Sequence, residues 1–142
     1  MKVSFSAYGT PKGQPRARAF RRWNHTGVYD PGTADAWKFS VREAARSVMG
    51  EVHFEGRPLR VSIDFYFPRP KKHFRKCGLR HDAPRWHTQK PDRDNLEKAV
   101  LDALTTLGIW EDDSQVCCGQ VRKLWSESST GLAVVTISDE ME

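Results

Sequence analysis

Acidic residues and one lysine are concentrated in the run PDRDNLEKAVLDALTTLGIWEDDSQV, residues 91–116. Asp92 and Asp94 stand where an apolar helix pattern begins, and Lys98 follows Asp94 by one helical turn. Asp112 and Asp113 come after that pattern, just before the next expected strand. If this strand packs beside the beginning of the helix, Asp113 reaches Asp92 and Asp94. Three carboxylates in one place repel one another unless a cation lies between them, and hard oxygen ligands suit Mg²⁺, with Mn²⁺ as the alternative.

A site of this kind would act on phosphate esters. A divalent ion held by the three aspartates polarises a phosphate and activates a water molecule for in-line attack. Lys98 would then face the scissile phosphate or the leaving oxygen. Structural roles also suit these residues, because Asp94 and Glu97 match a helix capping box. Asp94 and Lys98 match an ordinary i,i+4 ion pair, and residues 111–114 match a solvated turn.

A second set of residues has the ligand types of a zinc site. His73, Cys77 and His81 follow one another at four-residue spacing, and His87 is nearby. Zinc binds imidazole and thiolate ligands, but no C-x₂-C pair accompanies these residues. The sequence has neither a Walker A loop nor a G-x-G-x-x-G motif, so we expect no nucleotide cofactor.

Two strongly basic segments lie before the acidic run. Residues 1–25 contain six Lys or Arg and no acid, and residues 68–90 contain eight Lys or Arg and one acid. Phe20 and Trp23 lie in the first segment, and Phe74 and Trp86 lie in the second. Cations neutralise phosphates and aromatic rings stack on exposed bases, so this pattern favours a nucleic-acid partner. The residues that we expect to contact DNA in the second segment are Arg69, Lys71, Lys72, Arg75, Lys76 and Lys90.

Hydrophobic spacing predicts six elements in the order β-α-β-α-β-β. Apolar residues alternate most strictly over residues 59–67, which indicates a strand. Leu96, Val100 and Leu104 belong to a single apolar stripe at helical spacing, and Gly108 ends that helix. The other elements are expected at residues 3–8 (strand), 37–48 (helix), 116–125 (strand) and 132–137 (strand).

Turn signals complete the expected layout. The turn-rich residues 126–131 predict that the last two strands form a hairpin. Residues 9–30 and 69–91 show no period and are expected to be basic loops, and the second is long enough to suggest function. The predicted fold is a single α+β domain over residues 1–142, with one mixed sheet of about four strands and two packed helices.

Length and composition agree with one globular domain. The chain has 142 residues, a net charge of +5 and 38% hydrophobic residues. No apolar run approaches the roughly 20 residues of a membrane span, so no membrane partner is expected. No apolar signal-peptide segment is evident near the N-terminus. Three cysteines, two of them adjacent, make a poor disulfide framework and favour the reducing cytoplasm.

The acidic run closely resembles the signature of the RusA family of Holliday junction resolvases. The shared pattern is D-x-D-N-L-x-K-A-x-x-D-A-L followed by G-x-W-x-D-D-x-Q-V, over about 25 residues of this chain. The resemblance implies a homodimeric, Mg²⁺-dependent endodeoxyribonuclease of recombination and repair that cuts four-way DNA junctions by paired symmetric nicks. It places the essential aspartates at Asp92, Asp94 and Asp113 and the catalytic lysine at Lys98. Asp112 matches the neighbouring acidic position.

Two other functions fit parts of the sequence. A non-catalytic branched-DNA-binding protein would use the same basic segments, and its acidic residues would only cap and solvate the helix. A zinc-stabilised interaction module would instead use His73, Cys77 and His81. Nicking in the presence of Mg²⁺ separates the nuclease from the first alternative, and metal content separates it from the second.

Overall fold

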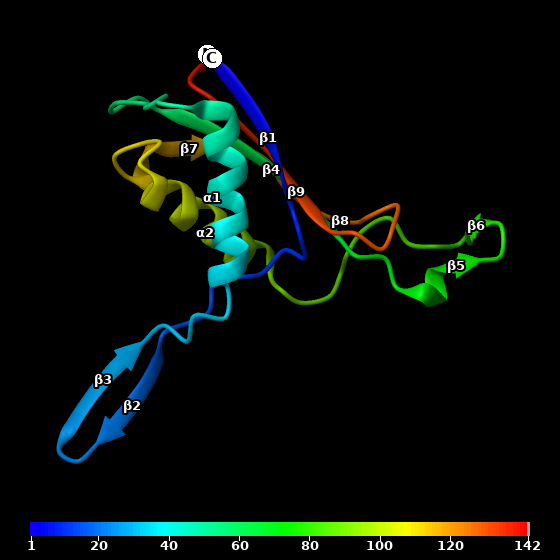
Figure 1. Ribbon diagram of the computed structural model, residues 1–142, viewed down its shortest axis with the longest axis horizontal. Helices are drawn as coiled ribbons and strands as arrows, with labels where there is room; N and C mark the ends of the chain where they lie inside the picture. Colours follow the sequence, from blue (N-terminus) through cyan, green and yellow to red (C-terminus); the bar gives the residue numbers. More distant parts are fainter. Residues whose placement is uncertain (142) are drawn as a thin grey trace.

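The computed structural model describes residues 1–141 as a central sheet with two helices on one face and two projecting segments (Figure 1). Two short 3₁₀ turns, η1 and η2, accompany the strands and helices. The elements are β1 (Lys2–Tyr8), β2 (Arg18–Arg22), β3 (His25–Tyr29), α1 (Asp35–Met49), β4 (Leu59–Phe67), η1 (Lys71–His73), β5 (Phe74–Arg75), β6 (Gly78–Leu79), α2 (Arg93–Leu107), η2 (Asp113–Gln115), β7 (Val116–Cys118), β8 (Val121–Trp125) and β9 (Leu132–Ser138).

The central sheet is mixed and has five strands. β9 pairs antiparallel with both β1 and β4, whereas β7 and β8 pair parallel with the other edge of β4. Gly119 and Gln120 separate β7 from β8 on this shared edge, and the register with β4 shifts within β7, opposite Leu59 and Arg60. The α+β class, the mixed sheet and the two packed helices are therefore confirmed, and the sheet has one strand more than expected.

The predicted hairpin of residues 116–125 and 132–137 is wrong. β8 and β9 lie on opposite sides of β4 and do not pair with each other. The turn between them passes around the end of β4, where the amide of Ser126 donates to the carbonyl of Phe67 at 2.8 Å. The predicted strand is also divided in two at Gly119, because this glycine packs directly against the backbone of β4.

The hydrophobic core lies between the sheet and the helices. Val61, Ile63 and Phe65 alternate along β4 and are buried on the face that the helices cover. α1 contributes Val41, and the apolar stripe of α2 is fully buried, as its spacing predicts. The opposite face of the sheet carries no helix (Figure 1). No helix within residues 1–141 combines the length and hydropathy that a bilayer span requires.

Both regions expected to be loops contain structure. β2 and β3 form an isolated two-stranded sheet that projects from the body, and we call residues 18–29 the hairpin arm (Figure 1). Residues 69–90, the basic arm, contain η1 and the β5–β6 pair. The basic arm returns along the free edge of β8, where the amide of Trp125 donates to the carbonyl of Arg85 at 2.9 Å. Isolated short pairs of this kind leave little trace in hydrophobic periodicity.

Candidate active site

The predicted acidic residues lie along one helix and the turn that follows it. α2 begins at Arg93, with Asp92 in the extended N-cap conformation, and the side chain of Asp92 makes no capping hydrogen bond. Asp94 is in the first helical turn, where its Oδ1 accepts a hydrogen bond from the amide of Asn95 at 2.9 Å. The capping box with Asp94 as N-cap is therefore not formed. Both carboxylates are exposed at the positive end of the helix dipole, which favours anions.

Lys98 forms an ion pair with Asp102 within α2. Its Nζ donates to Oδ1 of Asp102 at 3.3 Å, across one helical turn. The expected pair with Asp94 is not the one formed. Asp94, Lys98 and Asp102 are spaced at i, i+4 and i+8, so they follow one another along one face of α2. This spacing was the available signal for Asp102.

Asp113 lies close to this same face of α2. Burial raises the pKa of Asp113, and the neighbouring carboxylates of Asp112 and Asp102 raise it further. The ammonium group of Lys98 acts in the opposite direction and lowers this pKa. Asp112 differs, because hydrogen bonds from Ser114 hold its pKa below the usual range. Adjacent aspartates thus have opposite shifts, and Asp113 is the one whose ionisation its surroundings disfavour.

Gln115 fixes the turn that carries both aspartates. Its Oε1 accepts hydrogen bonds from the amides of Glu111 and Asp112, at 2.9 and 3.3 Å. Its Nε2 donates to the carbonyls of Phe54 and Arg57, at 2.9 and 3.0 Å. The side chain therefore ties η2 to the segment before β4. Gln115 is part of the G-x-W-x-D-D-x-Q-V signature, but a glutamine in a turn gives no signal of its bonding partners.

Asp92 interacts with strand β8. Its charge acts on Lys123 of β8, whose pKa is lowered by burial and raised by Asp92. Lys123 also donates to the carbonyl of Gln89 at 2.5 Å. Val116 pairs with Leu59 at the beginning of β4, whereas Lys123 pairs with Phe65 farther along, so the strand residue on which the charge of Asp92 acts belongs to β8.

The structure therefore brings Lys98, Asp102 and Asp113 together and leaves Asp92 at the beginning of α2. Six residues separate Asp92 from Lys98, which corresponds to about 9 Å along the helix axis. Within residues 1–141, no three acidic, histidine or cysteine side chains are close enough to form a ready metal site. The carboxylate oxygens still have the chemistry that Mg²⁺ requires. The raised pKa of Asp113 reflects burial first and, after it, the repulsion from Asp112 and Asp102 that a cation would relieve.

Comparison with known proteins identifies the family of this arrangement. The family model described as Endodeoxyribonuclease RusA matches residues 8–137, most of the chain. The chain belongs to the RusA family. This RusA-family chain is 34% identical over 128 residues to the uncharacterised protein YqaN of Bacillus subtilis (strain 168), covering 88% of this chain and 89% of that protein.

Two relatives of this RusA-family chain have functional names. The crossover junction endodeoxyribonuclease rusA of Lactococcus phage r1t is 32% identical over 73 residues, which cover 51% of this chain and 49% of the phage protein. The crossover junction endodeoxyribonuclease RusA of Escherichia coli (strain K12) is 24% identical over 110 residues, which cover 78% and 76% of the two chains.

The basic residues of the RusA-family chain divide into exposed and structural ones. Lys71, Lys72, Arg75, Lys76 and Lys90 are exposed on the basic arm. Arg69 is only 7% exposed, and its guanidinium donates to the carbonyls of Ser126 at 2.8 Å and Pro84 at 2.5 Å. Arg69 therefore fastens the basic arm to the body, and it is not placed to contact DNA.

The zinc alternative has no support in the geometry. His73 packs edge-on against Trp125, with ring centroids 5.2 Å apart, whereas Cys77 and His81 are exposed. His87 is buried and stacks on Phe67 with ring centroids 3.8 Å apart. In the described part of the chain, these side chains do not converge as metal ligands.

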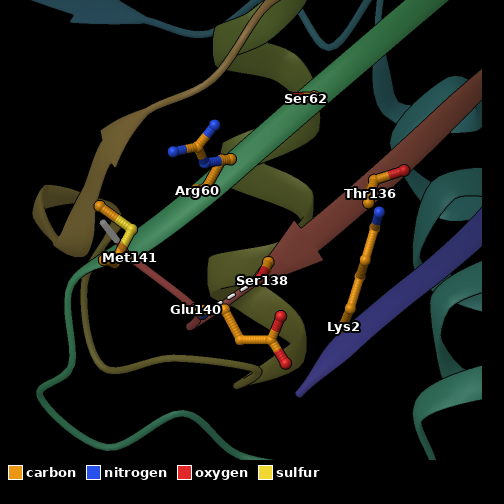
Figure 2. Close-up of a pocket in the computed structure, with 7 residues that line it drawn as sticks. All are labelled: Lys2, Arg60, Ser62, Thr136, Ser138, Glu140 and Met141. Atoms are coloured by element: carbon orange, nitrogen blue, oxygen red, sulfur yellow. Dashed lines mark hydrogen bonds between the residues drawn. The ribbon is translucent and has the colours of Figure 1, made fainter.

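A polar hollow lies on the sheet face that carries no helix. Its volume is about 620 Å³, and side chains from β1, β4, β9 and the segment after β9 surround it (Figure 2). Lys2 and Arg60 supply positive charge, whereas Glu140 supplies negative charge. The hydroxyl groups around it already have partners, for example Thr136 Oγ1 with Ser4 Oγ at 3.2 Å. None of the predicted site residues lines this hollow.

Proposed function

We propose that this RusA-family protein is a Mg²⁺-dependent endodeoxyribonuclease that cuts four-way DNA junctions by paired symmetric nicks. One observation carries the proposal: the acidic start of α2 lies at the bases of two basic arms. The amide of Gln14, which leads into the hairpin arm, donates to the carbonyl of Asn95 at 2.8 Å. On the other side, Lys123 donates to the carbonyl of Gln89 at the end of the basic arm, and the charge of Asp92 acts on Lys123. DNA held by either arm would be delivered to these carboxylates.

Asp92, Asp94 and Asp113 would hold the ion, with Mn²⁺ as a substitute for Mg²⁺. Their oxygens match the hard ligands that both ions take. When bound, the ion supplies polarisation of the phosphate and a water of lowered pKa. Asp113 must lose its proton before it can act as a ligand, and its raised pKa makes this step pH-dependent.

Lys98 would stabilise the charge that develops on the phosphate. Its ammonium group is exposed and lies near Asp113, so a phosphate at this position can reach it. Asp102 orients Lys98 in the free protein through the 3.3 Å contact. The exposed cations of the basic arm would hold the DNA backbone, because phosphate contacts fix position without reading sequence. These cations are Lys71, Lys72, Arg75, Lys76 and Lys90.

Paired symmetric nicks require two active sites. We propose that the protein works as a homodimer, because a two-fold dimer places one site at each of two opposed strands of a two-fold junction. The role in recombination and repair, and a location in the cytoplasm, follow from the DNA substrate.

A labelled synthetic four-way junction tests this function. We expect nicks in two opposed strands with Mg²⁺, and binding without efficient cleavage with Ca²⁺, whose looser coordination positions water poorly. Asp94→Asn and Asp113→Asn should abolish nicking and retain junction binding, whereas Glu111→Gln, which removes a nearby exposed acid, should cut normally. Calorimetric titration of Mn²⁺ should show weaker binding to both Asn variants. Binding with no nicking by the wild type in Mg²⁺ or Mn²⁺ would establish the non-catalytic alternative.

The salt dependence of binding tests the basic arm separately. Lys71, Lys72, Arg75 and Lys76 changed together to Gln remove up to four phosphate contacts. Because each contact contributes about 0.9 to the slope of log affinity against log salt, the slope should fall by up to roughly 3.6. Parallel slopes for the wild type and the quadruple variant would exclude these four residues from the DNA interface.

A further inference from the structure

The hairpin arm has almost no contact with the body and buries almost nothing. Its strands pair only with each other, and every strand residue except Gly27 is exposed. The arm is anchored at its base, where Asp30 accepts hydrogen bonds from the side chain of Gln14 at 3.0 Å and from the amide of Gly32 at 2.8 Å. The arm is thus a fixed projection whose tip stands away from the domain (Figure 1).

Trp23 occupies the tip of this arm in an unfavourable backbone conformation. It is the first residue of a two-residue turn between Arg22 and His25, with φ 58°. This is the position in hairpin turns where glycine is favoured, because a side chain is strained at positive φ. The side chain is nevertheless 88% exposed, so no burial within the described chain offsets the strain. A large ring held in the open at a strained tip indicates a role outside the folded monomer.

The other two aromatic rings of the arm pack against each other. Phe20 packs edge-on against Tyr29, with ring centroids 6.2 Å apart. The ring of Phe20 also covers Gly27 so closely that a Cβ there would lie 2.7 Å from it. These contacts stiffen the arm. Phe20 and Tyr29 keep 44% and 46% of their surface exposed, and Trp23, at 88%, is the most exposed ring of the arm.

The charge around the ring decides which partner fits. Arg18, Arg21 and Arg22 lie on the strand that leads to Trp23, and the first acid of the chain is Asp30 at the base. The exposed apolar side chains of Phe20, Val28 and Tyr29 lie nearer the base of the arm, whereas at the tip Trp23 follows two arginines and precedes Asn24 and His25. A protein-binding patch would gather apolar side chains around the ring. Arginine binds phosphates and an exposed ring stacks on unpaired bases, so the chemistry matches a nucleic acid with unstacked bases.

Resting on the proposed function, we propose that Trp23 inserts at the branch point of the DNA junction and stacks on a base that is unstacked there. The flanking arginines grip the phosphates on either side of it. The hairpin arm would thus discriminate branched DNA from linear duplex, because a continuous duplex offers no free base face at its centre. The exposed ring of the basic arm, Trp86, lies beside β8 through its bridge to Leu124 and not at a tip, so this arm supplies attraction to any DNA backbone.

The test compares junction and duplex binding by the intact protein in Ca²⁺, with 2-aminopurine placed at the branch point. Trp23→Gly removes the ring and suits the turn, since glycine adopts positive φ without strain. Val28→Ala removes an exposed apolar side chain elsewhere on the arm and serves as the matched control. Trp23→Gly should bind the junction roughly 5- to 100-fold more weakly and lose the 2-aminopurine signal, with little change in duplex affinity. Trp23→Phe should recover part of both, and Val28→Ala should resemble the wild type.

The outcomes separate this inference from the proposed function. If Trp23→Gly binds junction and duplex as the wild type does, the stacking role is overturned while nicking by the wild type still stands. If the wild type nicks nothing but shows Trp23-dependent 2-aminopurine changes, the stacking role stands and the nuclease proposal fails. Equal loss of junction and duplex affinity in Trp23→Gly would overturn discrimination by the ring. So would a change in oligomeric mass on sedimentation, because Trp23 would then serve protein contacts.

Discussion

Gly119 should be the residue of the β7–β8 edge that is least tolerant of substitution. Its φ is 141°, and a Cβ built there would lie 1.7 Å from the carbonyl oxygen of Val61. Real Cβ atoms stay about 3 Å or more from such atoms, so Gly119→Ala must displace either the loop or β4 by more than 1 Å. Strain at the positive φ costs about 1–2 kcal/mol and overpacking against backbone about 1–3 kcal/mol. We expect a total loss of roughly 2–5 kcal/mol.

The matched control is Gly56→Ala. Gly56 also has positive φ, 50°, but nothing lies within 4 Å of a Cβ at this position. Gly56→Ala should therefore lose only the cost of positive φ, about 1 kcal/mol of the free energy of unfolding. With about 4 °C of Tm for each kcal/mol in a domain of this size, Gly119→Ala should melt roughly 8–20 °C below the wild type and Gly56→Ala about 4 °C below.

Differential scanning calorimetry of both variants in EDTA measures the contrast. The difference between the two Tm shifts reports the contact with Val61 together with the larger backbone strain at φ 141° than at φ 50°. Because Gly119 lies between η2 and Lys123, Gly119→Ala should also slow junction nicking at temperatures where it remains folded. Equal Tm shifts for the two variants would show that the edge of β4 does not confine Gly119, and the account of why β7 and β8 are separate strands would fail.

Three further perturbations probe the site and its supports. Lys98→Ala should reduce single-turnover nicking by roughly 10²–10³ with a much smaller change in junction affinity, since a group that stabilises developing charge acts on the chemical step; a pure affinity loss would make Lys98 a phosphate anchor. The free energy of unfolding of His87→Phe should fall less between pH 8 and pH 5 than that of the wild type, as measured by urea unfolding. The pKa of buried His87 is lowered below its ordinary 6.5, so the unfolded chain takes up the proton first and stability falls as the pH drops below about 6.5. Arg122→Ala should destabilise the fold by about 1–3 kcal/mol in the same assay, because it removes two 2.7 Å hydrogen bonds and leaves the half-buried Asp64 unpaired; Asp64→Asn with Arg122→Gln should lose less.

Elements with an uninterrupted hydrophobic period were predictable from the sequence. β4 and α2 match their patterns because each presents one buried face to a single core. The pairing of the later strands was not predictable, since alternation identifies a strand without naming its neighbour. Residues 126–131 look like a hairpin turn, yet they cross the end of β4, and only tertiary contacts such as Ser126 with Phe67 show this.

The site was predictable in its residue types but not in its grouping. Lys98 and Asp113 do lie near each other, as the spacing suggested. Asp92 acts instead on Lys123, and the position of Asp113 depends on Gln115 holding η2 against the carbonyls of Phe54 and Arg57. Those acceptors lie more than fifty residues earlier in the chain, and no local sequence pattern indicates them. The segment 69–91 was predicted as a basic loop, but its course was not predictable, because the contacts of Arg69 with Ser126 and Pro84 determine it.

Asp92 and Asp113 are attached to different parts of the protein. Asp113 is fixed to the body through η2, whereas Asp92 stands where the backbone of α2 meets the segments that lead from both arms. The two groups of carboxylates therefore rest on different supports. Repulsion among carboxylates grows as they approach one another, so a cation is needed most where they are closest. In the proposed function, the arms that hold DNA are joined to the segment that carries Asp92, whereas η2 carries Asp113 on the body.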